Sequence, residues 1–300
     1  MSTPYHSEER HVQALARQIH QADRHGVMIA TSIIPGAWHF LAAQPMLVLG
    51  SWDGQRGAWP TLVMGAPDFA KTLDGTQVLL DMTAACADPD DRLWDNLQSN
   101  GLISLLAIEL ATRRRLRING HVTPRPGTSL ARSAFAVTVD QAYPNCPKYI
   151  QRRTVQIDHL NSATSPVHQG TALNDEQVKL IAGADTFFVA SVHPSSGTDV
   201  SHRGGTPGFV KIESSCCLRI PDYLGNSMFN TLGNIHVTGF AGLLFVDFTT
   251  GRQLQIIGDA SIDWSTDPQR SWSVKIRHVR ESSLPMGVRW EFVDASPFNP

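Results

Sequence analysis

Short apolar runs, interrupted by turn-forming residues, dominate the hydrophobic pattern along the chain. Residues 46–52 and 186–192 are almost continuously apolar, whereas residues 134–140 and 272–280 alternate apolar with polar positions. Runs of this length predict β-strands, and the alternating runs predict strands with one buried face. The pattern therefore predicts a mainly β protein with flanking helices.

The chain also repeats itself. GLISLLAIELATRRRLRINGHV at residues 101–122 aligns without a gap with GFAGLLFVDFTTGRQLQIIGDA at residues 239–260, so that Glu109 pairs with Asp247 and Gly120 with Gly258. One pair of similar apolar strands could arise by coincidence. Further matches follow in the same order across most of each half, which makes a duplication the better explanation.

Both copies are predicted to contain a helix, two strands joined by a glycine-containing turn, a second helix, a hairpin and a closing strand. In the first copy these are residues 37–44, 46–52, 58–65, 90–98, 101–122 and 134–140. In the second copy they are residues 176–183, 186–192, 198–204, 226–235, 239–260 and 272–280. Many short antiparallel strands favour a small closed barrel, which removes exposed sheet edges. A doubly wound parallel sheet is disfavoured because no GxGxxG follows a first strand.

Two further segments flank the copies. Residues 7–25 predict an amphipathic helix that covers a barrel flank, and residues 159–170, HLNSATSPVHQG, are rich in turn formers. We therefore expect an N-terminal helical extension at residues 1–34, a first barrel copy at 35–158, a linker at 159–172 and a second copy at 173–300.

Composition narrows the functional classes. A formal charge of −2 gives no broad basic field for nucleic acid, and no apolar run is long enough to span a bilayer. The four cysteines form no CxxC pair, and the twelve histidines include no HExxH pattern. We expect a cytoplasmic protein with reduced cysteines, no metal, and neither nucleic acid nor membrane as a partner.

Polar residues that suit an anion are concentrated in the second copy. Where the first copy has TLVMG at residues 61–65, the second has Ser201, His202, Arg203, Gly204 and a further glycine. Arginine forms charge-assisted hydrogen bonds to phosphate, and glycine lets a ligand approach the backbone. A solvated turn with a surface arginine explains this segment equally well.

The helix predicted at residues 226–235 carries Asn226, Asn230 and Thr231 near its start. A helix N-terminus offers free N–H groups and the positive end of a dipole, which suit phosphate. Simple capping of the helix by Asn226 is the alternative.

The stretch RQLQIIG at residues 252–258, preceded by LLFVDF, resembles the pyridoxamine 5′-phosphate oxidase family of FMN-binding split barrels. The resemblance implies tandem FMN-binding split β-barrels that form a pseudo-dimer, with FMN held mainly by the second copy. It also implies that Gln253, and more weakly Arg252, contacts FMN. The family's Arg-Lys phosphate pair falls near Asn230 and Thr231, so Arg203 or His202 must take over that role.

NCPKYIQRR at residues 145–153 and SPFNP at residues 296–300 resemble a bacterial branch of the same superfamily. In split-barrel dimers the segment after the closing strand contributes to the partner's site. The resemblance therefore brings Lys148, Tyr149 and Gln151 toward the flavin of the second copy. The alternative is a basic helix end at the surface.

Taken together, these features predict an FMN-dependent oxidoreductase whose substrate the sequence does not identify. An external electron donor such as NAD(P)H and a homodimer are also expected. A non-catalytic flavin- or haem-binding module and a purely structural duplicated barrel remain open, as does deazaflavin in place of FMN. The predicted cofactor-binding residues are Ser201, His202, Arg203, Gly204, Asn226, Asn230, Thr231, Arg252, Gln253, Lys148, Tyr149 and Gln151.

Overall fold

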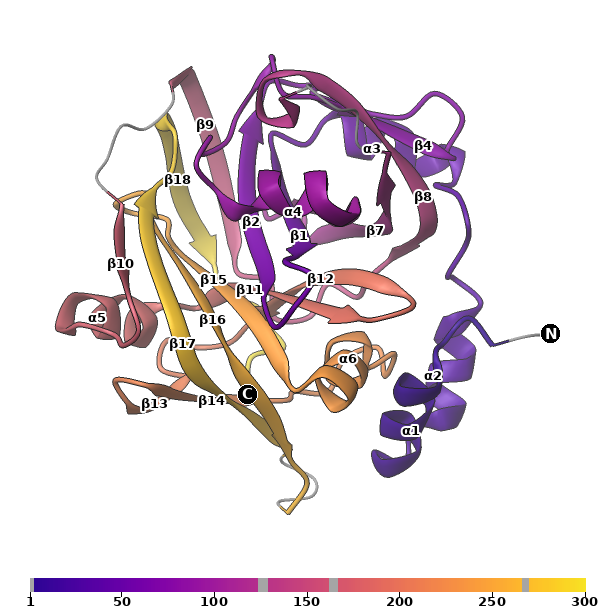
Figure 1. Ribbon diagram of the computed structural model, residues 1–300, viewed down its shortest axis with the longest axis vertical. Coiled ribbons are helices and arrows are strands. Elements are labelled where there is room, and N and C mark those ends of the chain that lie inside the picture. The colour runs from indigo at the N-terminus through magenta and orange to yellow at the C-terminus, as the bar shows by residue number, and fades with distance from the viewer. Residues whose placement is uncertain (1–2, 124–128, 162–166, 266–269) are drawn as a thin grey trace.

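In the computed structural model, which describes residues 3–123, 129–161, 167–265 and 270–300, the strands form two large antiparallel sheets and a small one (Figure 1). The first sheet contains β1 (Met46–Trp52), β2 (Ala58–Gly65), β3 (Ala70–Lys71), β4 (Gln77–Asp81), β5 (Ala85–Cys86), β6 (Leu102–Glu109), β7 (Arg114–Val122) and β8 (Ala134–Pro144). The second contains β10 (His168–Gly170), β11 (Thr186–His193), β12 (Gly197–Gly204), β13 (Lys211–Ser214), β14 (Cys217–Pro221), β15 (Phe240–Asp247), β16 (Arg252–Asp263) and β17 (Ser271–Ser283). β9 (Arg152–Asn161) pairs with β18 (Met286–Asp294) in the small sheet.

The two large sheets have the same strand order. The first runs β3-β4-β8-β7-β6-β1-β2-β5, and the second, read in the same direction, runs β13-β14-β17-β16-β15-β11-β12. Each of these seven strands of the second sheet thus takes the place of its counterpart in the first. β5 is an addition in the first sheet, and β10, which pairs with β17 outside this order, is an addition in the second. The repeated topology confirms the predicted mainly β fold of two split-barrel copies. The predicted domain boundaries stay predictions, and residues 162–166 of the predicted linker lie outside the described residues.

Helices cover the ends and flanks of the sheets. They are α1 (Ser7–Leu15), α2 (Ile19–Gly26), α3 (Trp38–Ala42), α4 (Arg92–Asn100), α5 (Asp175–Gly183) and α6 (Asn230–Thr238), with 3-10 turns η1 (Pro35–Ala37) and η2 (Leu130–Arg132). The single helix predicted at residues 7–25 is wrong, because the chain leaves the helical path at Arg17, whose φ is 56°. Among the described residues, no helix combines the length and apolar character needed to cross a membrane.

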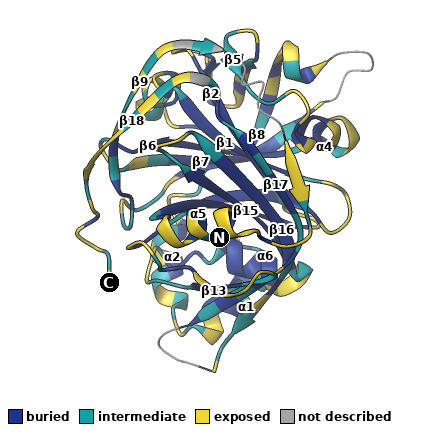
Figure 2. Cartoon of the chain, turned by 90° about the vertical axis from the view of Figure 1, so that its left-hand side faces the viewer, coloured by how far each residue is buried: buried dark blue, intermediate teal, exposed yellow. Residues whose placement is uncertain are grey.

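The central strands are buried on both faces (Figure 2). Along β1, Leu47 and Leu49 pack into the core of the first barrel. Met46 and Val48 point the other way, into a third core shared with Phe188 and other residues of the second copy. Strands that face their own barrel on one side and the sister copy on the other have no polar face. This explains why residues 46–52 and 186–192 read as continuous apolar runs.

Glycines mark the places where backbones come close. A Cβ added to Gly242 on β15 would lie 1.8 Å from the carbonyl oxygen of Ala58 on β2. The backbones of the two copies are therefore in contact here, and no side chain fits between them. The matched glycines Gly120 and Gly258 both lie at a register shift between the second strand of the hairpin and the closing strand, β7 with β8 and β16 with β17. Each stands where a Cβ would collide with the neighbouring strand, which is why the repeat keeps glycine at this bulge.

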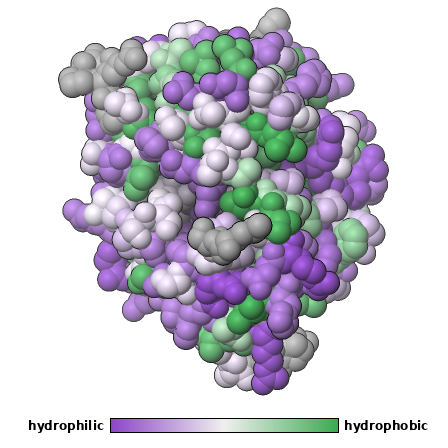
Figure 3. All heavy atoms as spheres, turned by 90° about the vertical axis from the view of Figure 1, so that its right-hand side faces the viewer, coloured by the Kyte–Doolittle hydropathy of each residue, from purple (hydrophilic) through white to green (hydrophobic). Residues whose placement is uncertain are grey.

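Hydrophilic residues cover most of the face shown in Figure 3, where hydrophobic residues form scattered groups. The N-terminal helices α1 and α2 lie beside α6 in the lower part of Figure 1. The extension therefore packs against the second copy, next to the start of the helix that was expected to bind phosphate.

Candidate functional site

A cleft lies between the two copies. Its walls come from β7 and residues 145–149 of the first copy, and from β12 and residues 221–231 of the second. The cleft has a volume of about 830 Å³, including the space at its open mouth.

Basic side chains dominate this cleft. Its lining includes Arg115, Arg117, Arg203 and Arg270 together with Lys148, whereas Asp222 is the one acidic residue among its described lining residues. Arg203 and Arg270 both approach Asp222, at 3.4 and 3.3 Å. Arg117 is paired with Asp199 outside the lining, at 3.0 Å, so Arg115 and Lys148 are the lining cations for which the described residues offer no ion-pair partner. The cleft therefore keeps a net positive charge, which favours an anion.

Several buried nitrogen atoms at this cleft have no hydrogen-bond partner in the described part of the chain. They are Arg115 Nε, Arg117 Nε, Arg203 Nε, His202 Nε2 and Asn145 Nδ2. A buried polar atom without a partner costs roughly 1–3 kcal/mol, and more when it belongs to a charged group. Such a concentration of unsatisfied nitrogens in one place is typical of a site that a ligand completes.

Arg115 is the least compensated of the arginines. Its nearest partners are His202 Nδ1 at 3.3 Å and Cys146 Sγ at 3.7 Å. Burial lowers the pKa of Arg115 to about 10, an effect that Cys146 opposes and Arg117 reinforces. Burial, followed by the nearby Arg115 and Arg203, also holds the pKa of His202 well below its usual value. His202 is therefore neutral near pH 7 and adds a hydrogen-bonding group rather than a charge.

The start of α6 opens onto the same cleft without a capping side chain among the described residues. Phe229 stands at the N-cap in a left-handed conformation, with φ of 60°. The helix begins at Asn230, four residues later than predicted, because the side chain of Asn226 accepts a hydrogen bond from Met228 N and forms a turn before the helix. The alternative interpretation, simple capping of the helix by Asn226, is therefore wrong. The free N–H groups of the first turn are available to an anion.

The corresponding helix of the first copy is capped. Asp91 precedes α4, and its carboxylate accepts hydrogen bonds from Leu93 N at 2.8 Å and Thr61 Oγ1 at 2.7 Å. Gln255 Nε2 of the second copy donates to the same carboxylate at 2.8 Å. Asp91 thus supplies a built-in anion at the position that the second copy leaves open at Phe229.

Each of these two positions is built from both copies. Gln255 on β16 reaches the first copy's Asp91, whereas Arg117 on β7 reaches the second copy's Ser201, with Nη2 to Oγ at 2.6 Å. The cleft at the second copy is therefore lined by the hairpin of the first. The gapless alignment of the two hairpins places Arg115 opposite Gln253, but the family resemblance had assigned the FMN contact to Gln253.

For this reason the structure does not bring Arg252 and Gln253 to the cleft. Gln253 on β16 is buried, and its Nε2 donates to Ser283 O at 3.4 Å. Arg252, the residue before it, points to the opposite face of the strand and forms an ion pair with Glu281 at 2.7 Å. The sequence analysis missed Arg115 and Arg117, which take the places of Gln253 and Gln255 in the first copy and line the cleft.

Gln151 also lies outside the lining, and it holds the wall in place. Its Nε2 donates to Tyr149 O at 3.1 Å and its Oε1 accepts from Ser296 N at 2.7 Å. The two motifs that resemble a bacterial branch, residues 145–153 and 296–300, are thereby in direct contact. Tyr149 O in turn approaches Gly204 so closely that a Cβ there would lie 2.0 Å away.

The other nine predicted residues do line the cleft. Tyr149 OH donates to Leu224 O at 3.0 Å, and its ring lies 5.2 Å from that of Tyr223, so one wall is aromatic. The nine are Ser201, His202, Arg203, Gly204, Asn226, Asn230, Thr231, Lys148 and Tyr149.

Comparison with known proteins adds a likeness of fold. No protein-family model and no curated protein matches the sequence. Among solved structures, a HupZ protein of Group A Streptococcus matches at 16% identity over 39% of this chain and 98% of its own, with a TM-score of 0.31. A Clostridium acetobutylicum protein of the pyridoxinephosphate oxidase family, related to general stress protein 26, matches at 10% identity over 37% and 92%, with a TM-score of 0.27.

A Mesorhizobium loti FAD-binding protein matches at 11% identity over 39% of this chain and 99% of its own, with a TM-score of 0.27. The chain is similar to pyridoxamine 5′-phosphate oxidase-family proteins. That similarity concerns the fold. The assignment of two split-barrel copies rests on the repeated strand order rather than on these matches.

Proposed function

We propose that this chain is an FMN-dependent oxidoreductase that holds its cofactor in the cleft between the two copies. The observation that carries the proposal is the group of buried arginine nitrogens without hydrogen-bond partners, on Arg115, Arg117 and Arg203, beside the uncapped start of α6. A phosphate monoester carries close to two negative charges at neutral pH and accepts several hydrogen bonds at once. The residues present therefore fit the phosphate of FMN.

The cleft residues have distinct tasks in this proposal. Arg115 and Arg203 bind the phosphate together with the first N–H groups of α6. Tyr149 and Tyr223 offer aromatic surface at the mouth, where an isoalloxazine ring can pack, and Lys148 places positive charge nearby. Bound FMN supplies hydride or electron transfer, and the protein residues orient it and set the local charge.

Both halves of the site lie within one chain, since the first copy contributes β7 and the second contributes β12 and α6. A second chain is thus not needed to complete it. The expected homodimer, the NAD(P)H donor and the cytoplasmic location stay predictions, and the substrate is not assigned.

The proposal is tested by comparing FMN with riboflavin, which lacks the phosphate. We expect FMN to bind with quenching of its fluorescence, and riboflavin to bind at least about 100-fold more weakly, because several charge-assisted contacts are lost. Inorganic phosphate should compete with FMN. Equal affinity for the two flavins would contradict the phosphate assignment.

A second measurement separates an enzyme from a carrier. The absorption spectrum of the protein as purified distinguishes flavin from haem, and anaerobic addition of NADH or NADPH then tests reduction. Bleaching of the flavin with turnover supports the oxidoreductase. A flavin that no nicotinamide donor reduces favours a binding module, and a haem spectrum overturns the FMN proposal.

A further inference from the structure

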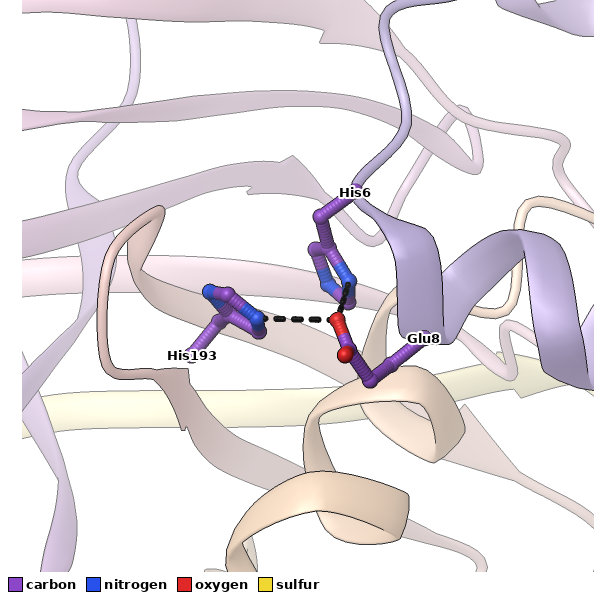
Figure 4. Close-up of side chains that lie close together, drawn as sticks. All are labelled: His6, Glu8 and His193. Atoms are coloured by element: carbon purple, nitrogen blue, oxygen red, sulfur yellow. Dashed lines mark hydrogen bonds and ion pairs between the residues drawn. The ribbon is translucent and has the colours of Figure 1, made fainter.

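Three side chains that the flavin proposal does not use meet at the start of α1. His6 and Glu8 come from the N-terminal arm, and His193 ends β11. Glu8 Oε2 lies 3.2 Å from His6 Nδ1 and 3.0 Å from His193 Nε2, as Figure 4 shows. The three ligand-type atoms all lie within 4.8 Å of one another. The sequence gives no motif for this group, because Glu8 and His193 are 185 positions apart.

The neighbours of His6 determine which of its ring nitrogens carries the proton. Asn234 Nδ2 donates to Ser191 Oγ at 3.0 Å, which turns Asn234 Oδ1 toward His6 Nε2, also at 3.0 Å. His6 Nε2 is therefore the N–H, and Nδ1 holds a lone pair. Histidines that bind metals typically donate their other N–H to an oxygen in this way.

The lone pair of His6 Nδ1 faces a carboxylate. Glu9 N already donates to Nδ1 at 3.2 Å, so Nδ1 acts as an acceptor while Glu8 Oε2, another acceptor, lies at the same distance. A metal cation between the two atoms removes this conflict by taking the lone pair of Nδ1 in place of Glu9 N.

His193 can adapt to such an ion. Without metal, its Nε2–H donates to Glu8, and its Nδ1 accepts from Ser195 N at 3.3 Å and from Ser196 N at 3.1 Å. When Nε2 coordinates a metal, the ring proton moves to Nδ1, where Ser195 Oγ at 3.2 Å accepts a hydrogen bond in place of those two N–H donors. Both imidazoles are 11% exposed and Glu8 is 28% exposed, so an ion has a path from solvent.

We propose that His6, Glu8 and His193 form a binding site for a divalent transition-metal ion of the zinc type. Two imidazoles and one carboxylate are ligands that zinc favours, and three protein ligands leave a position for water. The ion would tie the N-terminal arm to β11. Because Asn230 at the cleft donates to Glu9 at 2.5 Å, the arm that the ion holds also supports the cleft wall.

The test is a calorimetric titration of Zn²⁺ into the full chain after chelator treatment and dialysis. We expect one equivalent to bind to the wild type, with affinity at least about 10-fold lower in His193→Gln and in Glu8→Gln. Co²⁺ in place of Zn²⁺ should give the visible absorption of a low-coordinate site in the wild type only. Zn²⁺ should also raise the melting temperature of the wild type and not that of His193→Gln.

His236→Gln provides a matched control. His236 stacks on His11 with ring centroids 4.8 Å apart, so it is another histidine pair between the N-terminal arm and the second copy. Its variant should keep wild-type Zn²⁺ affinity. Equal Zn²⁺ affinity in the wild type and His193→Gln, or an equal loss in His236→Gln, would overturn the proposal. FMN binding measured on the same samples distinguishes failure of this site from failure of the flavin proposal.

Discussion

Arg115 and Gln253 occupy equivalent positions in the two hairpins but serve different sites. The sequence alignment identified the pair, and nothing in the sequence stated that each hairpin crosses to the other copy. Side-chain chemistry was sufficient to single out Arg203 and its neighbours. It was insufficient for Gln253, because its environment depends on how the copies pack and not on its own strand.

Substituting each of these two residues by the other tests whether Arg115, and not Gln253, contacts FMN. We expect Arg115→Gln to weaken FMN binding by about 10–100-fold, the equivalent of roughly 1.5–3 kcal/mol for a hydrogen bond to a charged group. Gln253→Arg should leave FMN affinity unchanged, because Gln253 does not line the cleft. Fluorescence titration measures both, and a larger loss in Gln253→Arg would show that the site lies in the other hairpin.

Arg203→Ala should also lower FMN affinity by about 10-fold or more, since it removes a charge-assisted phosphate contact. Arg289→Ala is the control, because Arg289 is 70% exposed and forms a surface ion pair with Asp158. Retained flavin after purification gives a second readout. Equal flavin content in Arg203→Ala and the control would argue against a phosphate at Arg203.

At the scale of elements, α4 and α6 are equivalent helices with different starts. The apolar and polar pattern predicted both helices, but it placed the start of α6 at Asn226, where an asparagine resembles a cap. The turn from Asn226 to Met228 competes for that side chain. Whether a capping residue joins the helix or the turn before it depends on such local competition, which composition does not reveal.

Asp91 caps α4, whereas α6 has no capping side chain among the described residues. Without the Asp91 carboxylate, the start of α4 should therefore be able to bind an added anion. We expect Asp91→Ala to lower the free energy of unfolding by about 2–4 kcal/mol, because α4 loses its cap and Thr61 and Gln255 lose an acceptor. Added phosphate should recover part of this loss. Asp91→Asn, which keeps one acceptor oxygen, should be affected less, and thermal unfolding with and without phosphate decides between these outcomes.

At the scale of the whole molecule, the sequence repeat predicted the fold. Two copies with the same apolar and polar pattern form the same strands, which the structure arranges in the same order. The internal pseudo-dimer followed from the family resemblance. The contact between β9 and β18 did not follow, since it joins segments that lie outside the repeated block and whose pairing depends on how the copies are placed.

The close packing of the copies predicts that a larger residue at position 242, in place of Gly242, destabilises the protein. Gly242→Val should lower the free energy of unfolding by at least about 1–3 kcal/mol, since its side chain meets Ala58 O of the other copy. Gly183→Ala in α5 has open space around the added methyl group, so stability should be unchanged or rise by about 0.4–1 kcal/mol. Chemical denaturation of both variants checks the difference, and equal stability would mean that the copies can move apart.

A crystal structure of the chain grown with FMN tests the central claim most directly. The account predicts phosphate density between Arg115, Arg203 and the first turn of α6, with Asp91 still bound to Thr61 and Gln255 in the first copy. Phosphate bound at Gln253, or a flavin bound away from both arginines, would contradict it.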